Sequence, residues 1–346
     1  MLSRKNVGKG LTKFSLTLLT AIGAAASASA LSLGSDFASD FTVTDLGSPA
    51  GVPTRLGGLT LKPSDPDTLL IGGNANTSSG RLYEIGVSRD GSGSIDGFTG
   101  TATSFGDVGE FNDGGVTFGP DGVLFTARWP SNELGQTKPG STNEDRIDAL
   151  GGLGIGGSSI SAINFVPAGF AGAGTAKVVT WNSGQFWDLS LAPDGSGTFD
   201  ITGATRVDLD PMTPVVDNLS GGPEGFVYID GSNPGFGGVD SMLVSDFSSD
   251  RVSAYEIDSI GNPVLSTRRD FITGLNGAEG AFIDPLTGDF LFSTFGGGDR
   301  VVRVSGFSAP TPPPAPVPLP AGGILLLTAL GGLGGAGALR RRRKEV

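Results

Sequence analysis

Carboxylates carry most of the chemistry that this sequence could perform. The chain has 35 aspartate and glutamate residues among 346, but it has no histidine and no cysteine. Their absence excludes Ser-His-Asp and Cys-His nucleophiles, the usual ligands of zinc and haem, and disulfides. Any catalysis would depend on carboxylates, lysine, tyrosine or a hard cation held by oxygen atoms. The sequence identifies no catalytic residue.

Three of these carboxylates recur at the start of similar short segments. Glu224 and Glu279 each precede a glycine and an apolar run, and Asp113 precedes Gly114-Gly115. If these segments surround one channel, the three side chains could hold Ca²⁺, which takes about six to eight oxygen ligands. Asparagines on adjoining segments could assist, namely Asn112, Asn218 and Asn276. The alternative is that the two glutamates are solvated at a channel mouth or accept backbone N–H groups in turns.

The segments that would position these residues belong to a repeat. Short apolar, β-branched runs alternate with turns rich in glycine, aspartate, serine and proline, and helical periodicity is nearly absent. The repeated phrase is a pair of residues that are usually glycine or glutamate, a strand, a turn with proline or aspartate, and a second strand. Five copies, 47 to 63 residues apart, begin at Gly57, Gly114, Ser161, Glu224 and Glu279. Four antiparallel strands per copy are typical of a β-propeller blade.

We therefore predict an all-β fold, a β-propeller of five to seven four-stranded blades over residues 31–307. Radial packing buries both faces of each sheet, and closing the ring limits exposed strand edges. The last copy is short, so we expect Phe41–Leu46 to supply the outer strand that closes the ring. A degenerate sixth repeat could occupy residues 149–159 or the long spacing between the third and fourth copies. An antiparallel sandwich would explain the strands but not the repeat.

Other polar and aromatic features have simpler explanations than chemistry. The segment 132–148 is long and polar, which favours a functional insertion or a disordered loop. Asp90–Asp96 and Asp194–Asp200 are near-duplicates that we interpret as tight hairpins, not calcium loops. The tryptophans could form a sugar-binding platform if exposed. Their positions favour exposure in a turn for Trp129 and blade core for Trp181 and Trp187.

The repeated phrase resembles that of NHL-type and gluconolactonase-like propellers. Gluconolactonase-like propellers place a Glu-Gly pair at a comparable strand start, where the glutamate binds a divalent metal. Glu224-Gly225 and Glu279-Gly280 match that pair. The remaining metal ligands and the catalytic aspartate of those enzymes have no identifiable counterpart here. The resemblance implies a divalent-metal-dependent hydrolase or lactonase as an alternative to a binding protein.

Residues 1–30 have the layout of a secretory signal peptide. Four basic residues precede an apolar segment, Phe14–Ala26, and the small-residue motif Ala28-Ser29-Ala30 follows. We expect cleavage after Ala30, with Ala28 and Ala30 forming the recognition motif.

The C-terminus combines a linker, a short motif and an apolar run. A proline-rich linker, residues 308–316, is followed by a motif at 317–321 and an uncharged run at 321–339. This run has 19 residues, close to the ~20 that a membrane-spanning helix needs. The motif is Val317, Pro318, Leu319, Pro320 and Ala321. A basic tail at 340–344 would stop transfer, and it consists of Arg340, Arg341, Arg342, Arg343 and Lys344.

This arrangement at residues 317–346 resembles the VPLPA-CTERM sorting signal, a relative of the PEP-CTERM signals of Gram-negative bacteria. The resemblance implies the export machinery and an exosortase-type enzyme as partners. It also implies anchoring through the C-terminal helix, followed by display at the cell surface or outer membrane, or release after processing. An ordinary single-pass tail anchor is the alternative.

The charge between these two ends is strongly acidic. The first thirty residues carry four basic and no acidic side chains, and the last seven carry five basic and one acidic. The part between them therefore has 14 basic and 34 acidic residues, a formal charge of −20. Such a surface repels nucleic acid and anionic lipid. We expect an exported surface or matrix protein with a binding or structural role, whose ligand is a polysaccharide, a protein or calcium. A purely structural spacer is a further alternative.

Overall fold

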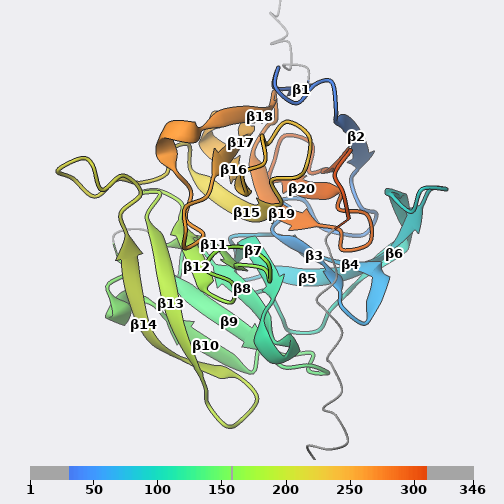
Figure 1. Cartoon of the computed structure of the whole chain (residues 1–346). Helices are drawn as coiled ribbons and strands as arrows, with labels where there is room; N and C mark the ends of the chain where they lie inside the picture. Colours follow the sequence, from blue (N-terminus) through green and yellow to red (C-terminus); the bar gives the residue numbers. More distant parts are fainter. Residues whose placement is uncertain (1–30, 157–158, 310–346) are drawn as a thin grey trace, which may run out of the picture.

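Five antiparallel sheets surround a common axis, and each is one blade of a β-propeller (Figure 1). The computed structural model describes residues 31–156 and 159–309. The first strand of each blade lies innermost, because these five strands contact one another around the axis. This architecture confirms the predicted fold class, and the number of blades is five.

Each blade is a meander of four strands. Blade 1 contains β3 (Leu59–Lys62), β4 (Asp65–Gly73), β5 (Arg81–Arg89) and β6 (Ile95–Ser104). Blade 2 contains β7 (Asn112–Phe118), β8 (Leu124–Arg128), β9 (Glu133–Thr137) and β10 (Arg146–Ala149). Blade 3 contains β11 (Ile160–Phe165), β12 (Ala176–Thr180), β13 (Phe186–Pro193) and β14 (Phe199–Val207). Blade 4 contains β15 (Pro223–Ile229), β16 (Ser241–Asp246), β17 (Arg251–Glu256) and β18 (Arg269–Thr273). Blade 5 contains β19 (Ala278–Ile283), β20 (Phe290–Thr294), β21 (Val301–Ser305) and β2 (Thr42–Gly47).

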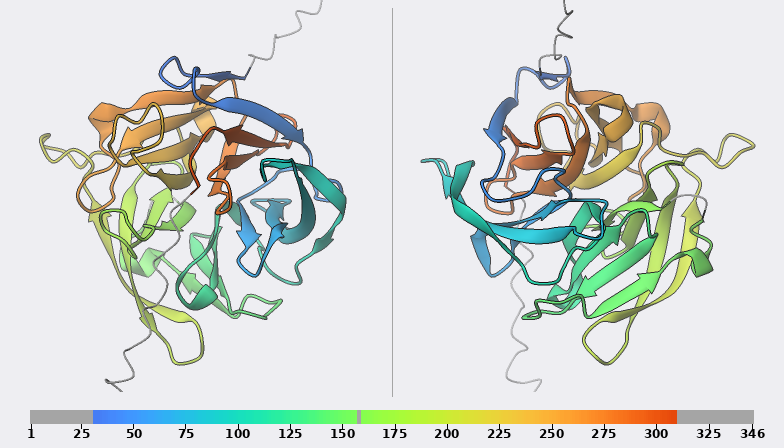
Figure 2. Two further views of the ribbon diagram at one scale, coloured as in Figure 1. Left: turned by 45° about the vertical axis from the view of Figure 1, so that its right-hand side comes forward. Right: turned by 180° about the vertical axis from the view of Figure 1, so that it is seen from behind.

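An N-terminal strand closes the ring. Strand β2 pairs antiparallel with β21, with Thr42 opposite Ser305, and so completes blade 5 (Figure 2). This confirms the outer strand predicted at Phe41–Leu46. A two-residue strand, β1 (Ser32–Leu33), also pairs with β18 at the edge of blade 4. The first strands of the described chain thus join the last two blades.

Two sequence expectations about blade 2 and its surroundings were wrong. Residues 132–148 are not an inserted or disordered loop, because they form most of the hairpin between β9 and β10. Strand β10 is short and polar because it lies at the outer edge of the blade. Residues 149–159 do not hide a sixth repeat, since the described part of this segment contains only the end of β10 and a 3₁₀ turn, Gly151–Leu153.

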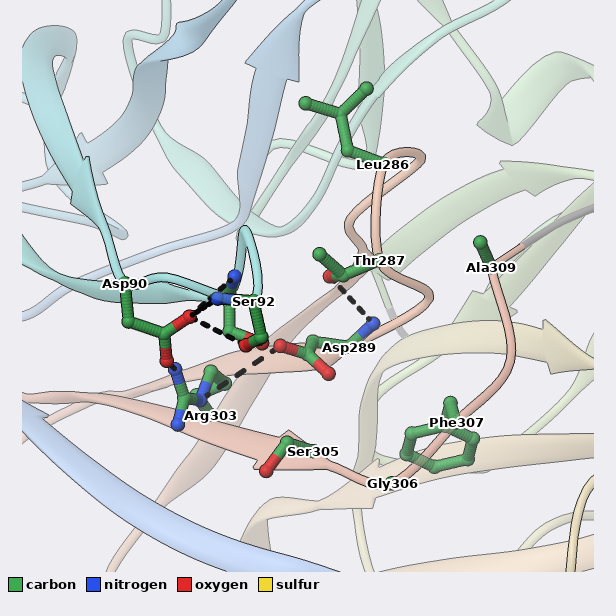
Figure 3. A pocket seen from close by; sticks show the side chains of 11 residues that line it. Asp90, Ser92, Leu286, Thr287, Asp289, Arg303, Ser305, Gly306, Phe307 and Ala309 are labelled. Carbon is green, nitrogen blue, oxygen red and sulfur yellow. Dashed lines mark hydrogen bonds and ion pairs between the residues drawn. The ribbon is translucent and has the colours of Figure 1, made fainter.

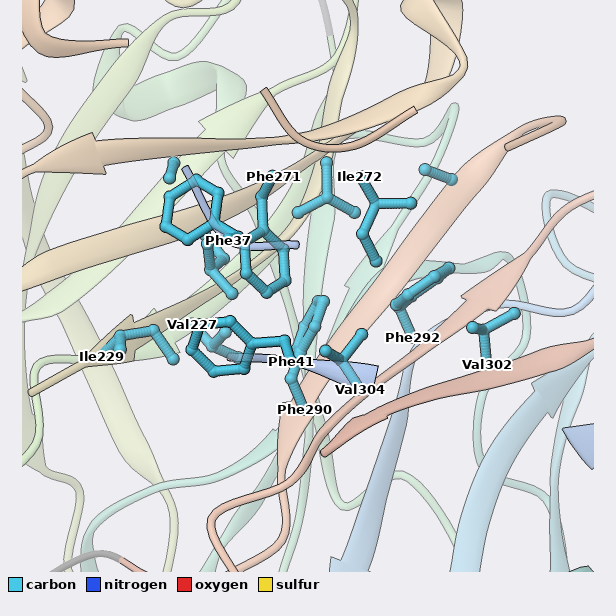
Figure 4. Close-up of a cluster of buried hydrophobic side chains, with 14 of the residues drawn as sticks. Phe37, Phe41, Val227, Ile229, Phe271, Ile272, Phe290, Phe292, Val302 and Val304 are labelled. Carbon is cyan, nitrogen blue, oxygen red and sulfur yellow. The ribbon is translucent and has the colours of Figure 1, made fainter. Parts of the chain in front are cut away.

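The hydrophobic core lies between neighbouring blades. Its most aromatic part joins blades 4 and 5, where Phe37 and Phe41 from the N-terminal segment pack against Phe271 with ring centroids 5.0 and 5.6 Å apart (Figure 4). Phe307 follows β21, and the centroid of its ring lies 4.4 Å from that of Phe41. Burying a phenylalanine side chain stabilises a fold by about 1.5–3 kcal/mol. The two ends of the described chain are therefore held together by apolar burial as well as by strand pairing.

Glycines in the innermost strands explain the repeated phrase. A Cβ atom on Gly225 would lie 2.4 Å from the backbone nitrogen of Ala281, and one on Gly280 would lie 2.6 Å from the Cα of Gly58. Only glycine permits this close approach of neighbouring backbones. The glycine after Glu224 and Glu279 is thus required by the narrow centre of the ring, and it brings the preceding side chains together.

No helix within residues 31–156 and 159–309 is long and apolar enough to cross a membrane. The predicted signal peptide, the sorting motif, the apolar run at 321–339 and the basic tail lie outside the described residues.

Candidate metal centre

Three carboxylates from three blades meet at the centre of the ring. Asp113 comes from β7, Glu224 from β15 and Glu279 from β19. One carboxylate oxygen from each lies within 4.8 Å of the others. We call Asp113, Glu224 and Glu279 the channel triad. The structure therefore brings together the three residues that the sequence had singled out.

A bulge at the start of each contributing strand aims these side chains inward. In blade 4, Pro223 lies opposite Asp246 and Phe226 opposite Val244, so one extra residue is accommodated between the paired positions. Blade 5 repeats this irregularity between Ala278 and Ala281. Bulges of this kind reorient side chains, and they are common beside functional sites.

Blade 2 carries a wider bulge, which explains the position of its carboxylate. Three residues lie between the paired Asn112 and Val116, whereas their partners are Arg128 and Thr126. The additional residue moves Asp113 to the place that Glu224 and Glu279 occupy. For this reason the aspartate precedes the glycine that begins the corresponding repeat in the sequence.

The channel triad is buried and lacks a cationic partner. The exposed fractions of Asp113, Glu224 and Glu279 are 1%, 4% and 1%. No lysine or arginine in the described part of the chain forms an ion pair with any of them, although other buried carboxylates have such partners. Examples are Asp284 with Arg89 at 2.5 Å and Asp246 with Arg251 at 3.1 Å.

Several oxygen atoms of the triad also lack hydrogen-bond donors. Both carboxylate oxygens of Asp113, Oε2 of Glu224 and Oε1 of Glu279 are buried without a hydrogen-bond partner among the described residues. A buried oxygen without a partner is costly, and a buried carboxylate more so. The site is therefore suited to a positively charged group that the described side chains do not supply.

Burial shifts the protonation of the triad. Desolvation raises the pKa of Asp113 to about 7. Polar side-chain contacts from Glu279, Asn76 and Glu224 oppose this rise. Desolvation also raises the pKa of Glu224 well above its usual value, and the charges of Asp113 and Glu279 add to the effect. The pKa of Glu279 rises well above its usual value for the same reason, burial first and then the charge of Asp113.

Asn76 is a neighbour of the triad that the sequence did not identify. Its backbone N–H donates to the carbonyl of Asn112 at 2.9 Å, and its side-chain Oδ1 is buried without a partner among the described residues. Its amide lies near Asp113 and favours the ionised form of that carboxyl. Asn76 and Asn74 both have positive φ, 65° and 50°. Asparagine adopts positive φ more readily than most residues, but nothing in the sequence marks this turn as the one beside Asp113.

The asparagines proposed from the sequence have other surroundings. Asn112 is fully buried, and its Nδ2 donates to the carbonyl of Gly109 at 2.6 Å. Asn218 accepts a hydrogen bond from Arg206. Asn276 is exposed. Of the three, Asn112 alone is adjacent in sequence to a triad residue.

The remaining blades contribute no carboxylate to the triad. Ser161 in blade 3 is fully buried, and its Oγ donates to the carbonyls of Val179 at 3.2 Å and Pro223 at 2.6 Å. In blade 1, the carbonyl of Gly57 accepts a hydrogen bond from Ser293 at 2.6 Å. Blades 1 and 3 therefore complete the wall of the channel, and blades 2, 4 and 5 supply its charge.

The residues present fit a hard divalent cation. All the donors are oxygen atoms, which suit Ca²⁺, Mg²⁺ or Mn²⁺ better than softer metals. Two ligands of one calcium ion, each ~2.4 Å from it, lie at most ~4.8 Å apart. The spacing within the triad meets this limit. The triad, with Oδ1 of Asn76, could therefore hold such an ion.

Two surface pockets lie elsewhere. One, of about 450 Å³, is lined by residues that include Asp90, Asp289 and Arg303 (Figure 3). Its charges are largely matched, since Arg303 lies 3.8 Å from Asp90 and 3.9 Å from Asp289. A second pocket, of about 610 Å³, lies between blades 1 and 2, where Lys62 and Glu84 form an ion pair at 2.5 Å. Neither pocket includes the channel triad.

The hairpins that begin at Asp90 and Asp194 are turns, as predicted. Oδ1 of Asp90 accepts the backbone N–H groups of Ser92 at 2.9 Å and Ser94 at 3.1 Å. Asp194 accepts those of Ser196 and Thr198 at 2.7 and 3.1 Å. These side chains satisfy their own turns and need no ion.

The tryptophans are placed differently from one another. Trp187 is buried in the core of blade 3, as expected. Trp181 was expected there too, but it follows the end of β12, is only half-buried, and contacts the half-buried Trp129 with ring centroids 5.8 Å apart. The strand that the sequence predicted at this position ends one residue earlier, which turns Trp181 out of the sheet.

Comparison with known proteins gives no family. No protein-family model matches the chain, and no curated protein matches it. Among solved structures, it is similar to an auxiliary nutrient binding protein from Bacteroides ovatus, with 10% identity and a TM-score of 0.41 over 77% of this chain and 76% of that one. It is also similar to a putative gluconolactonase, with 14% identity and a TM-score of 0.39 over 76% and 81%. A third similar structure is the PQQ-bound form of an aldose sugar dehydrogenase from Streptomyces coelicolor, with 13% identity and a TM-score of 0.37 over 75% of this chain and 82% of that one. Likenesses this distant do not identify a ligand.

Proposed function

We propose that this protein is an exported binding protein whose propeller holds a divalent cation, best suited to Ca²⁺, in the channel triad. One observation carries this proposal. Three buried carboxylates from three blades meet, and no lysine or arginine among the described residues forms an ion pair with them. A structural role alone would be served better by apolar side chains at this place.

The type of donor favours calcium over other cations. Asp113, Glu224 and Glu279 supply carboxylate oxygens, and Asn76 can add an amide oxygen. Calcium accepts such mixed oxygen ligands in variable geometry, whereas magnesium requires near-octahedral geometry and retains several waters. A site built from the side chains of three separate blades suits the more tolerant ion.

Calcium titration of the mature chain tests this proposal directly. After purification in EDTA and removal of the chelator, calorimetric titration with CaCl₂ should reveal one site, and binding should raise Tm. Glu224→Gln and Glu279→Gln should abolish this response. Glu144→Gln is a matched control, because Glu144 is also buried but is paired with Arg128 at 2.5 Å. Absence of calcium binding to the unaltered chain, with no response to Mg²⁺ or Mn²⁺, would refute the proposal.

The place of action follows from the two ends of the sequence. The signal-like residues 1–30 and the VPLPA-like residues 317–346 support export, sorting by an exosortase-type enzyme, and surface display or release. The acidic surface suits a calcium-containing exterior and disfavours nucleic acid. Mass spectrometry of the mature protein from fractionated cells tests this: an intact, unprocessed chain in the cytosol would contradict it.

A metal-dependent hydrolase or lactonase is the second candidate. It is favoured by the Glu-Gly pairs at residues 224–225 and 279–280, which match the metal-binding pair of gluconolactonase-like propellers. When bound, the metal would be held by Asp113, Glu224 and Glu279 and would supply Lewis acidity. Turnover of simple esters and lactones, lost in Asp113→Asn, is the expected result; no turnover above the uncatalysed rate would eliminate this candidate.

A further inference from the structure

Four aromatic residues form an arc at one end of the propeller. Each comes directly after the second strand of its blade, in blades 2 to 5, and they are Trp129, Trp181, Phe247 and Phe295. We call these four residues the aromatic collar. All four are half-buried, which distinguishes them from the fully packed aromatics between the blades.

The members of the collar are structurally equivalent. The backbone N–H of Phe247 donates to the carbonyl of Gly222 at 2.9 Å, and that of Phe295 to Gly277 at 2.8 Å. Each acceptor lies two residues before a triad glutamate. The backbone N–H of Trp129 donates in the same way to the carbonyl of Phe111, two residues before Asp113. That of Trp181 donates to the carbonyl of Ser159, two residues before Ser161. The same backbone geometry thus places one aromatic ring per blade.

Neighbouring rings of the collar touch edge to face. The centroids of Trp129 and Trp181 lie 5.8 Å apart, those of Trp181 and Phe247 6.2 Å, and those of Phe247 and Phe295 5.9 Å. The interplanar angles are 78°, 73° and 73°. The guanidinium of Arg55 lies 5.9 Å from the centroid of Phe295 and extends the arc to blade 1.

The collar lies at the same end of the ring as the channel triad. Strand pairing places Pro223, next to Glu224, opposite Asp246, the residue before Phe247. Ala278, next to Glu279, lies opposite Thr294, the residue before Phe295. Asn112 and Arg128 relate Asp113 to Trp129 in the same way. Each triad carboxylate therefore has a collar ring beside it in its own hairpin.

We propose that the collar and the channel triad together bind a neutral sugar. The inference rests on the proposed cation site. Three carboxylates supply only part of the about six to eight oxygen ligands that Ca²⁺ takes, so hydroxyl groups of a ligand can supply others. The rings offer apolar surface to the C–H face of a pyranose.

Charge decides between ligand classes. The acidic triad and the net charge of −20 between the chain's signal-like ends disfavour phosphates, nucleotides and uronates. Blade 1 carries Asn74 where the other blades carry an aromatic residue, so the collar is interrupted there. The buried, unpartnered Oδ1 of Asn76 lies in the same turn and supplies a polar contact at that gap.

The experiment applies the mature chain to an array of neutral and anionic oligosaccharides, in CaCl₂ and in EDTA. We expect binding to at least one neutral glycan in CaCl₂, weakened at least tenfold in EDTA. The hit is then titrated against Trp129→Ala, Phe295→Ala and Trp187→Phe. The two collar variants should bind at least tenfold more weakly, and Trp187→Phe, which alters a tryptophan of the blade core, should bind normally.

A separate titration with CaCl₂ alone distinguishes the two proposals. Collar variants that still bind calcium are folded, so weaker glycan binding in them would support the sugar site. Calcium binding without any neutral glycan binding overturns this inference and leaves the cation site standing. Glycan binding that is equal in EDTA, or unchanged in both collar variants, also overturns it. Should either variant fail to fold, Trp181→Leu, which keeps an apolar side chain but removes the ring, replaces it, with the same expected weakening.

Discussion

Two clusters of three carboxylates in this molecule are neutralised in different ways. In one, Glu110, Glu133 and Glu144 surround the guanidinium of Arg128 at 3.1, 3.1 and 2.5 Å. We call these four residues the Arg128 cage. The other is the channel triad, which has no such partner in the described chain. The chain therefore supplies its own cation where one blade can provide it, and none where three blades meet.

The difference is reflected in the pKa of the buried acids. Burial raises the pKa of Glu144, but the charge of Arg128 lowers it and so opposes the rise. In the channel triad the neighbouring charges are of the same sign, and they raise the pKa of Glu224 further. The comparison teaches that a buried acidic cluster must be neutralised, by a side-chain cation, by a cation from solution or by retained protons.

Removing the guanidinium of Arg128 should have the largest effect on stability. We expect Arg128→Met to lower the free energy of unfolding by about 3–5 kcal/mol, because it leaves Glu144 buried and unpaired. Denaturant unfolding monitored by tryptophan fluorescence measures this. Arg300→Met is the matched control: its ion pair with Asp45 is half-exposed on both sides, and its loss should cost less than about 1 kcal/mol. Equal losses in the two variants would contradict the interpretation of the cage.

Removing one acid should have opposite effects in the two clusters. In EDTA at pH 8, Glu224→Gln should raise the free energy of unfolding by about 1 kcal/mol or more, because it relieves repulsion between unpaired charges. Glu144→Gln should lower it by about 1.5–3 kcal/mol, since a buried charged hydrogen bond is lost.

Calcium affinity provides the second half of this comparison. Glu224→Gln should weaken calcium binding at least ~100-fold, since loss of a group that merely supports a metal ligand already costs about 10–100-fold. Glu144→Gln should leave the affinity unchanged. If both substitutions destabilise the metal-free protein and neither alters calcium binding, the triad is an ordinary structural cluster.

Stability of the metal-free protein should fall as pH rises. The folded pKa of Asp113 is about 7, above the ordinary aspartate value of 3.8. Between those values the folded state retains a proton that the unfolded state has released, so stability decreases with rising pH and levels off above about pH 7. Glu224 and Glu279 act in the same direction from about pH 4.5 upward.

Urea unfolding in EDTA at pH 5, 6, 7 and 8 measures this dependence. Asp113→Asn should flatten the slope more than Glu144→Gln, because the charge of Arg128 limits the rise in the pKa of Glu144. Excess CaCl₂ should abolish the decline, because binding requires the ionised triad and becomes stronger as pH rises. Stability that rises steadily from pH 5 to 8 in EDTA would show that the triad is ionised and stabilised in some other way.

The sequence predicted the propeller and its closing strand because both depend on patterns within short segments. Apolar runs and turns identified the strands, and the shortened last copy implied the partner at Phe41–Leu46. The Arg128 cage lies within residues 110–144, yet no pattern marked it, because the positions of Glu133 and Glu144 depend on the hairpin between β9 and β10, which the sequence did not predict.

Convergence of the channel triad was predicted, but its neighbours were not. Glu224 and Glu279 occupy the same position in their repeats, so the sequence could align them. The extra residue in the bulge of blade 2 becomes evident only from the pairing of Asn112 with Arg128. Asn76 belongs to a turn whose conformation is not encoded by periodicity. The collar has a signal that could have been found: Phe247, Phe295 and Trp129 each come directly after the second strand of their repeat.

Within the Arg128 cage, the smallest effect should come from its most exposed acid. The side chain of Glu110 is 41% exposed and that of Glu144 is 6%. We expect Glu110→Gln to change the free energy of unfolding by less than about 0.5 kcal/mol, because solvent already screens its charge. Raising NaCl from 0.1 to 1 M, which shortens the screening length from about 10 to 3 Å, should remove even this difference.

The same salt series should leave the effect of Glu144→Gln nearly intact, because a buried pair is screened much less than an exposed one. A cage in which Glu110→Gln costs as much as Glu144→Gln would mean that proximity to Arg128, not burial, sets the energy. Burial would then be no reason for the channel triad to need a cation, and the contrast between the two clusters would have to rest on calcium binding alone.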